Sequence, residues 1–354
     1  MIAAEEMWPV MLATLIITFV SIFLLRPLAI RINLVDVPTE RKLHEDHIPL
    51  TGGLAIFSGL LFATLLISLF FPSTPTNEKL VFLLATSAII LVIGLVDDYK
   101  DLGPLIRFLV QTLACLIMMV STGIYVESLG NLIGTGEIHL GLWGIPFTVL
   151  AVVGFINAVN MMDGIDGLAG GISLLAILAI LGFQGVSGSF KHVDMLVILA
   201  AVLIPYMMSN LGMFGLPRIF LGDAGSMLIG YLIAWTLIIL SQSPQGEDVA
   251  ISPVNTLWCV AVPLLDMWAV MFKRLRQRIS PFTADRGHLH HLFISHGISD
   301  YRVLLIILLG AILLMGIGVV THYLMPTAGF VVFLFVLVVY VTVNMLLERK
   351  LSMN

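Results

Sequence analysis

The chain has 354 residues, of which 59% are hydrophobic and 11% are charged, and its formal net charge is −5. Soluble domains carry about 25% charged residues, so this composition excludes an ordinary water-soluble protein. The two cysteines, Cys115 and Cys259, both lie in apolar stretches, which excludes a disulfide framework and a cysteine-based metal site. The sequence also lacks a Walker-type phosphate-binding loop, which argues against an ATP-driven pump.

Apolar stretches recur along the whole chain and are long enough to cross a bilayer as helices. Crossing about 30 Å of hydrocarbon takes about 20 mostly apolar residues, and a backbone in lipid must bond internally, which favours helices over strands. The sequence therefore predicts a single all-α membrane domain over 1–354 that contains eleven transmembrane helices. These are expected at 7–29, 50–71, 80–96, 105–124, 143–160, 168–186, 194–211, 225–241, 252–272, 302–322 and 327–347.

Basic residues are distributed unequally between the two sets of connections that alternate along such a bundle. One set holds only Lys79 and Lys191. The other set holds the remaining fifteen, which are Arg26, Arg31, Arg41, Lys42, Lys100, Arg107, Arg218, Lys273, Arg274, Arg276, Arg278, Arg286, Arg302, Arg349 and Lys350. Because Lys and Arg concentrate on the cytoplasmic side of a membrane, we expect an outward N-terminus and a cytoplasmic C-terminus.

Two adjacent acids, Asp97 and Asp98, follow the third predicted helix in the stretch LVDDYKDLG. The carboxyl end of a helix disfavours a carboxylate by about 0.3–1 kcal/mol. A solvated helix end is the alternative, but acids held against this preference favour contact with a metal ion or a cationic group. Arg107, ten residues beyond Asp97, is expected to return to the same place and hold a phosphate.

A second polar stretch, NAVNMMDGIDGLAGG, joins the fifth and sixth predicted helices. Two asparagines on one face of an apolar helix lead into a turn with two Asp-Gly pairs, namely Asn157, Asn160, Asp163-Gly164 and Asp166-Gly167. Asp-Gly pairs alone are ordinary turn residues. Directly after two intramembrane amides, they favour a site that offers oxygen ligands to a hard cation or a polar ligand.

The connection before the eighth predicted helix reads FLGDAGS and places Asp223 between Gly222 and Gly225. Asp223 or Ser226 as a simple helix cap is the alternative to a functional role. A glycine-flanked helix N-terminus also binds phosphate through its free N–H groups. Phe220 is a candidate to stack on a nucleotide base.

Two further loops on the predicted cytoplasmic side carry basic residues. In the last one, Arg286, His288, His290 and His291 favour binding of a diphosphate, because the sequence offers no second motif for zinc. In the first one, Arg41, Lys42, His44 and the Gly52-Gly53 pair are candidates to contact phosphate, with an ordinary positive-inside loop as the alternative. Carboxylates that hold a metal and cations that hold phosphates fit metal-assisted phosphoryl transfer.

Five stretches in this order carry a specific resemblance, namely VDVPTERKLHEDHIPLTGG, GLVDDYKDLGPLIR, NAVNMMDGIDGLAGG, FLGDAGS and SPFTADRGHLHH. The resemblance extends over nearly the whole chain. The chain resembles the polyprenyl-phosphate N-acetylhexosamine-1-phosphate transferases, and especially their undecaprenyl-phosphate N-acetylglucosaminyl-1-phosphate transferase branch. The resemblance implies transfer of N-acetylglucosamine-1-phosphate from UDP-N-acetylglucosamine to undecaprenyl phosphate, with release of UMP, as the first step of a surface polysaccharide. It further implies a multi-pass protein of the bacterial inner membrane with its active site on the cytoplasmic face.

The resemblance also implies a role for each matched residue and a requirement for Mg²⁺ or Mn²⁺. Asp223, Asn160 and Asp98 match metal-site positions, and Asp97, Asp98, Asp163 and His290 match catalytic positions. Asp166, Gly164 and Phe220 match uracil-binding positions, whereas Arg107, Arg286, His288 and His291 match positions near the diphosphate and sugar. A homodimer is expected by analogy, and a nucleic-acid partner is not.

Two alternatives remain open at this stage. The cell-wall phospho-N-acetylmuramoyl-pentapeptide transferases usually carry three consecutive histidines where this sequence reads HLHH, so the departure favours the N-acetylglucosamine branch over them. Other UDP-N-acetylhexosamine donors are not excluded by it. A secondary transporter would line a path through the bilayer with polar groups, whereas the polar residues of this chain gather at one face.

Overall fold

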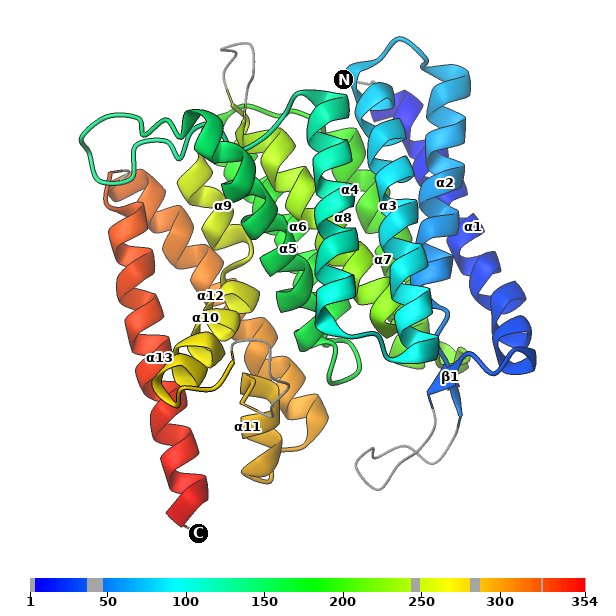
Figure 1. Cartoon of the computed structure of the whole chain (residues 1–354). Coiled ribbons are helices and arrows are strands. Elements are labelled where there is room, and N and C mark those ends of the chain that lie inside the picture. The colour runs from blue at the N-terminus through cyan, green and yellow to red at the C-terminus, as the bar shows by residue number, and fades with distance from the viewer. Residues whose placement is uncertain (1–3, 37–46, 243–248, 281–286, 326, 354) are drawn as a thin grey trace. The chain divides into compact units, whose positions relative to one another are not determined.

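The computed structural model describes residues 4–36, 47–242, 249–280, 287–325 and 327–353 (Figure 1). Within these ranges the chain is almost entirely helical, and its one sheet is the two-stranded pair β1–β2. Ten of the described helices are long and apolar enough to cross a membrane, or eleven spans if one bent pair counts as a span. The prediction of a polytopic all-α membrane protein is therefore confirmed.

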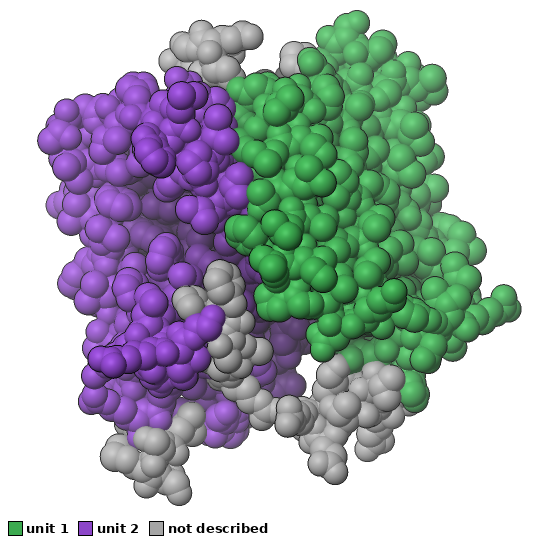
Figure 2. Space-filling model, viewed as in Figure 1, with its two compact units in different colours: residues 1–124, 191–236 green, residues 125–190, 237–354 purple. Residues whose placement is uncertain are grey.

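The chain divides into two compact units, which Figure 2 distinguishes by colour. Unit 1 comprises 1–124 and 191–236, and unit 2 comprises 125–190 and 237–354. Unit 1 contains α1 (Ala4–Arg31), β1 (Val35–Asp36), β2 (Ile48–Pro49), α2 (Gly52–Phe70), α3 (Pro75–Lys100), α4 (Pro104–Thr122), α7 (Val193–Asn210), the 3₁₀ turn η2 (Met213–Gly215) and most of α8 (Gly222–Ser241). In this unit α2 packs against α1, α3 and α7, and α3 packs against α4.

Unit 2 is built from the remaining helices. They are η1 (Gly141–Trp143), α5 (Gly144–Met162), α6 (Leu168–Ser187), α9 (Pro253–Cys259), α10 (Ala261–Arg276), α11 (Leu289–Ser295), α12 (Asp300–Leu324) and α13 (Gly329–Met353). In this unit α10 packs against α5, α12 and α13, while α6 packs against α9 and α12.

One predicted helix is wrong. The stretch expected to form a single helix at 252–272 is broken at Val260, where α9 and α10 meet at 84°. Proline at residue 263 has no backbone N–H and restricts the residue before it, which weakens the helix at this point. The break turns α10 away from the direction of α9.

Sequence features account for the ends of the other helices. Thr74 caps α3 by accepting from the N–H of Asn77, and Pro75 occupies the first turn, where its missing N–H costs nothing. Gly123 ends α4 with a φ of +67°.

The third helix is longer than predicted and extends to Lys100, so Asp97 and Asp98 lie within it. The short helix α11 was not predicted.

Burial differs strongly between the spans. The apolar window of α8 is completely buried, whereas only 22% of the window of α1 and 11% of the window of α13 are buried. The exposed side chains of α1 and α13 are large and apolar, for example Leu24, Phe335 and Val338. Such surfaces are stable in contact with lipid, which agrees with a multi-pass membrane protein.

Candidate functional site

The predicted site residues fall into two groups, one in each unit. Unit 1 contains Asp97, Asp98, Arg107, Phe220 and Asp223, and unit 2 contains Asn160, Asp163, Gly164, Asp166, His288, His290 and His291. Lys42 and Arg286 lie outside the described residues.

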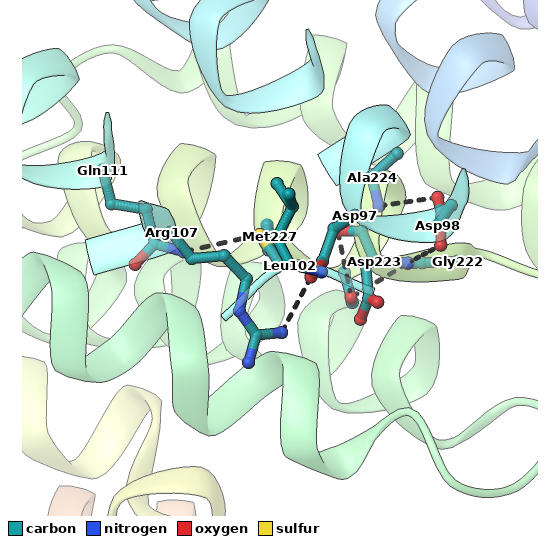
Figure 3. Close-up of polar contacts among 10 residues, drawn as sticks. Asp97, Asp98, Leu102, Arg107, Gln111, Gly222, Asp223, Ala224 and Met227 are labelled. Atoms are coloured by element: carbon teal, nitrogen blue, oxygen red, sulfur yellow. Dashed lines mark hydrogen bonds and ion pairs between the residues drawn. The ribbon is translucent and has the colours of Figure 1, made fainter. Parts of the chain in front are cut away.

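Asp97 has a cationic partner in the structure. The carboxylate is 4% exposed, and its Oδ2 accepts from an Nη of Arg107 at 2.8 Å while its Oδ1 accepts from the N–H of Leu102 at 2.7 Å (Figure 3). Arg107 lies in the first turn of α4 and returns to the last turn of α3, as the spacing predicts. Its Nε–H is buried without a protein partner among the described residues. The pair therefore leaves part of the guanidinium available for an anionic ligand.

Asp98 binds the N-terminus of α8. Its Oδ1 accepts from the N–H of Asp223 at 2.7 Å, and its Oδ2 accepts from the N–H of Ala224 at 3.1 Å (Figure 3). Free N–H groups and partial positive charge at a helix N-terminus stabilise a carboxylate. This contact compensates for the unfavourable position of Asp98 in the last turn of its own helix.

Gly222 makes this close approach possible. Its φ is +69°, a region that favours glycine, and a Cβ there would lie 2.8 Å from a carboxylate oxygen of Asp98. Another side chain at this position would both strain the backbone and displace Asp98. The glycine of the FLGDAGS motif is therefore explained by the geometry around the carboxylate.

The segment before α8 pairs with the start of α2. Phe220 donates its N–H to the carbonyl of Pro49 at 2.9 Å, and its own carbonyl accepts from the N–H of Gly52 at 2.9 Å. A Cβ at Gly53 would lie 2.6 Å from the backbone nitrogen of Gly225. The Gly52-Gly53 pair, a candidate phosphate contact in the sequence, thus serves close packing of two backbone segments.

In unit 2 the turn between α5 and α6 spans 163–167. The N–H of Asp163 donates to the carbonyl of Asn160 at 3.2 Å, and Gly167 caps α6 with a φ of +82°. Asn157 bonds within its own helix, because its Nδ2 donates to the carbonyl of Val153 at 2.7 Å. Asn160, Asp163 and Asp166 are all partly exposed, so a ligand can reach the polar side chains of this turn.

Three histidines at the start of α11 lie close together. The rings of His288 and His290 are stacked, with centroids 6.2 Å apart and an interplanar angle of 14°, and those of His290 and His291 are 4.1 Å apart. His290 is 1% exposed, and both of its ring nitrogens are buried without a protein partner among the described residues. Burial, helped by His291, lowers the pKa of His290 to about 3, so its imidazole is neutral at pH 7.

The histidines and the 163–167 turn meet at Gly164. A Cβ on Gly164 would lie 2.1 Å from Nε2 of His290 and 2.7 Å from its Cδ2. The absence of a side chain at Gly164 is therefore what lets His290 lie against the turn. Two motifs more than 120 residues apart in the sequence thus form one polar cluster.

Two residues that hydrogen bonds link to this cluster, Asp266 and Tyr340, were not predicted from the sequence. Asp266 lies on α10, is 1% exposed, and accepts from Nδ1 of His288 at 2.7 Å. Tyr340 on α13 donates its O–H to the same carboxylate at 3.1 Å. An acid inside an apolar stretch is itself a functional signal, and Asp266 lies in such a stretch.

The chain is similar to curated transferases over most of its length. Three relatives, from Salmonella typhi, Yersinia pestis and Pasteurella multocida strain Pm70, are each named undecaprenyl-phosphate alpha-N-acetylglucosaminyl 1-phosphate transferase. The Salmonella typhi protein is 37% identical over 88% of this chain and 83% of its own length. The Yersinia pestis protein is 37% identical over 84% of this chain and 80% of its own length. The Pasteurella multocida protein is 38% identical over 92% of both chains. The family model described as glycosyl transferase family 4 matches residues 80–241. The chain belongs to the family of these undecaprenyl-phosphate alpha-N-acetylglucosaminyl 1-phosphate transferases.

Membership confirms the resemblance drawn from the five motifs. The names of the three relatives agree with the N-acetylglucosamine branch, and none of them supports the muramoyl-pentapeptide alternative. The matched range of the glycosyl transferase model contains the Asp97–Arg107 pair, the 163–167 turn and the N-terminus of α8. This family member is therefore a membrane-embedded transferase.

Proposed function

We propose that this protein transfers N-acetylglucosamine-1-phosphate from UDP-N-acetylglucosamine to undecaprenyl phosphate, and that UMP is the second product. The similarity to three transferases of that name, over at least 80% of each chain, carries the proposal. The helical membrane fold supports it, because a polyprenyl acceptor is held in the bilayer. The reaction would begin a surface polysaccharide.

In this reaction an oxygen of the lipid phosphate attacks the β-phosphorus of the nucleotide sugar. The bond from that phosphorus to the bridging oxygen breaks, and UMP leaves with the bond's electrons. The second pKa of a phosphate monoester is about 6, so the attacking oxygen is mostly ionised at pH 7. The protein must therefore position the groups and neutralise charge, and it does not need to remove a proton.

The contacts of Asp97 fit a positioning role better than a role as a base. Both of its oxygens already accept hydrogen bonds, one of them from a guanidinium. Asp97 would then orient Arg107, whose remaining N–H groups bind a phosphate. The pair would serve the approach of two anionic substrates to each other.

Asp98 and Asp223 are the residues of unit 1 that would hold Mg²⁺. They fit this ion because both are carboxylates, they meet at the N-terminus of α8, and a carboxylate oxygen that accepts one N–H retains a second lone pair. Among the described residues no group of three or more His, Cys, Asp or Glu could hold a metal alone. Mg²⁺ needs only one or two carboxylates when phosphates supply other ligands, and a bound ion would neutralise charge on the diphosphate.

The polar cluster of unit 2 would bind the donor. His288, His290 and His291 would contact the diphosphate and sugar, and Asp166 of the neighbouring turn would recognise the uracil. Asn160 and Asp163 lie at the start of the same turn and would offer their side-chain oxygens to a hard cation or to the donor itself. The unpaired nitrogens of buried His290 support this assignment, because buried polar atoms are rarely left unsatisfied.

The distribution of basic residues supports a cytoplasmic active site in the inner membrane and an N-terminus outside. The fifteen Lys and Arg residues assigned to one side include those near both polar groups, and UDP-sugars are cytoplasmic metabolites. Lys79 lies near the N-terminal end of α3, and Lys191 precedes α7, at the opposite end of α7 from Arg218.

The test is an assay of detergent-purified protein with undecaprenyl phosphate, Mg²⁺ and one UDP-sugar at a time. UDP-N-acetylglucosamine should give UMP and the lipid-linked diphosphosugar, and chelation of divalent cations should stop the reaction. Asp223→Asn should abolish turnover, whereas Lys191→Ala should not change it. Preference for UDP-N-acetylmuramoyl-pentapeptide would establish the cell-wall alternative, and flux into vesicles without UMP release would establish a transporter.

A further inference from the structure

The carboxylate of Asp266 is the centre of a buried hydrogen-bond network in unit 2. It accepts from Nδ1 of His288 at 2.7 Å, from the N–H of Leu289 at 2.9 Å and from the O–H of Tyr340 at 3.1 Å. Three elements, α10, the start of α11 and α13, thereby meet at one side chain that is 1% exposed. A buried carboxylate with three donors is held in a single orientation.

Helix α13 supports this network along one face. Tyr340, Asn344 and Glu348 are spaced four residues apart and so lie on the same side of the helix. Tyr340 bonds to Asp266, and Glu348 forms an ion pair with Lys273, seven residues after Asp266 on α10. Two polar contacts two turns apart fix how α10 lies against α13.

The network determines how His288 can meet a ligand. Because Nδ1 bonds to Asp266, the other ring nitrogen, Nε2, is the atom that remains for a ligand. The same contact holds the ring of His288 parallel to that of His290, whose nitrogens have no protein partner among the described residues. Asp266 therefore determines which nitrogen of His288 faces a ligand and how its ring lies beside that of His290.

We infer that Asp266, supported by Tyr340, is a positioning residue that orients His288 toward the UDP-sugar. The inference rests on the proposed function, because it assigns the histidines to the donor. Partners that orient a metal-ligating histidine typically contribute about 10–100-fold to metal affinity or activity, and we expect a comparable effect for a histidine that binds a substrate. Asp266 itself touches neither substrate, and its whole contribution passes through His288.

A double-mutant cycle tests this inference. Asp266→Asn should lower kcat/KM for UDP-N-acetylglucosamine by about 10–100-fold and leave KM for the lipid acceptor unchanged. In a His288→Ala background the same substitution should change kcat/KM by less than about 3-fold, because the residue it orients is gone. Tyr340→Phe, which keeps the charge and two of the three donors, should have a smaller effect of the same kind.

Controls separate positioning from damage to the fold. Asp194→Asn replaces another buried acid, on α7, and Tyr323→Phe replaces an exposed tyrosine on α12. Both should leave kcat/KM unchanged. If Asp266→Asn does not fold, the cycle is run with Tyr340→Phe, and the folded fraction of every variant is measured by thermal unfolding.

Binding of UDP-N-acetylglucosamine by calorimetry is measured on the same variants. If the wild type binds the donor without transferring its phosphate, the proposed reaction fails while the binding cycle still tests Asp266. Additive effects of Asp266→Asn and His288→Ala would overturn the inference, and so would equal losses for the lipid acceptor. Failure of the wild type to bind the donor at all would overturn both proposals.

Discussion

Gly164→Ala is expected to slow transfer strongly while leaving the protein folded. The added methyl group would lie 2.1 Å from Nε2 of His290, whereas ordinary van der Waals contact begins at 3.4 Å. The ring or the turn must therefore move by roughly 1.3 Å. His290 is 1% exposed, so it has little free space into which it can move.

The size of the effect follows from this displacement. Overpacking by one methyl group costs about 1–3 kcal/mol of folding free energy. A displacement of about 1 Å near reacting groups costs about 100-fold in rate. We therefore expect kcat to fall about 100-fold in the UMP-release assay, with a folded protein in the thermal unfolding assay.

Gly182→Ala is the matched control, because this glycine lies within α6 and a Cβ there meets no atom within 4 Å. It should leave kcat unchanged. If Gly164→Ala keeps more than half of the wild-type kcat, the contact between the turn and His290 has no part in transfer. An undiminished effect of Gly164→Ala in a His290→Ala background would also refute the argument.

Three further predictions concern stability, measured by thermal unfolding in detergent. Asp98→Ala should lower the free energy of unfolding by about 1–3 kcal/mol, because two N–H groups of α8 lose their acceptor, whereas Asp300→Ala at an exposed helix start should change it little. Arg107→Met should lower the free energy of unfolding by about 2–3 kcal/mol, because it leaves the buried carboxylate of Asp97 unpaired. Adding Asp97→Asn should recover part of this loss. If no stability is recovered, the two residues are not coupled. Burial lowers the pKa of His290 from 6.5 to about 3, so the unfolded chain binds an extra proton between these values. Stability should therefore decrease as the pH falls below about 6.5, and His290→Gln should reduce that decrease.

Much of the fold follows from the sequence, because apolar length alone specifies a membrane helix. The break at Val260 was missed, since apolar residues continue on both sides of it and hydropathy carries no information about direction. The extension of α3 through Asp97 and Asp98 was missed because these polar residues suggested that the helix ends before them. In the structure each of the two carboxylates accepts a hydrogen bond from a donor outside α3, which stabilises it within the helix.

The candidate site shows a similar limit. Sequence reasoning identified the acids, amides and histidines by type and spacing, but it could not assign their partners. Asp97 and Asp98 lie against the dipole of their own helix, and the structure provides Arg107 and the N-terminus of α8 as compensation. Asp266 carried a signal as an acid in an apolar stretch, but its role depends on His288 and Tyr340, which are distant in the sequence.

The central claim is that the sugar leaves its nucleotide together with the β-phosphate. Its most direct test is the reaction of purified protein with UDP-N-acetylglucosamine that carries a radioactive label in the β-phosphate. The account predicts that the label appears in the undecaprenyl product and that unlabelled UMP forms in equal amount. Label that remains in the nucleotide, as UDP, would mean transfer of the sugar alone and would contradict the account.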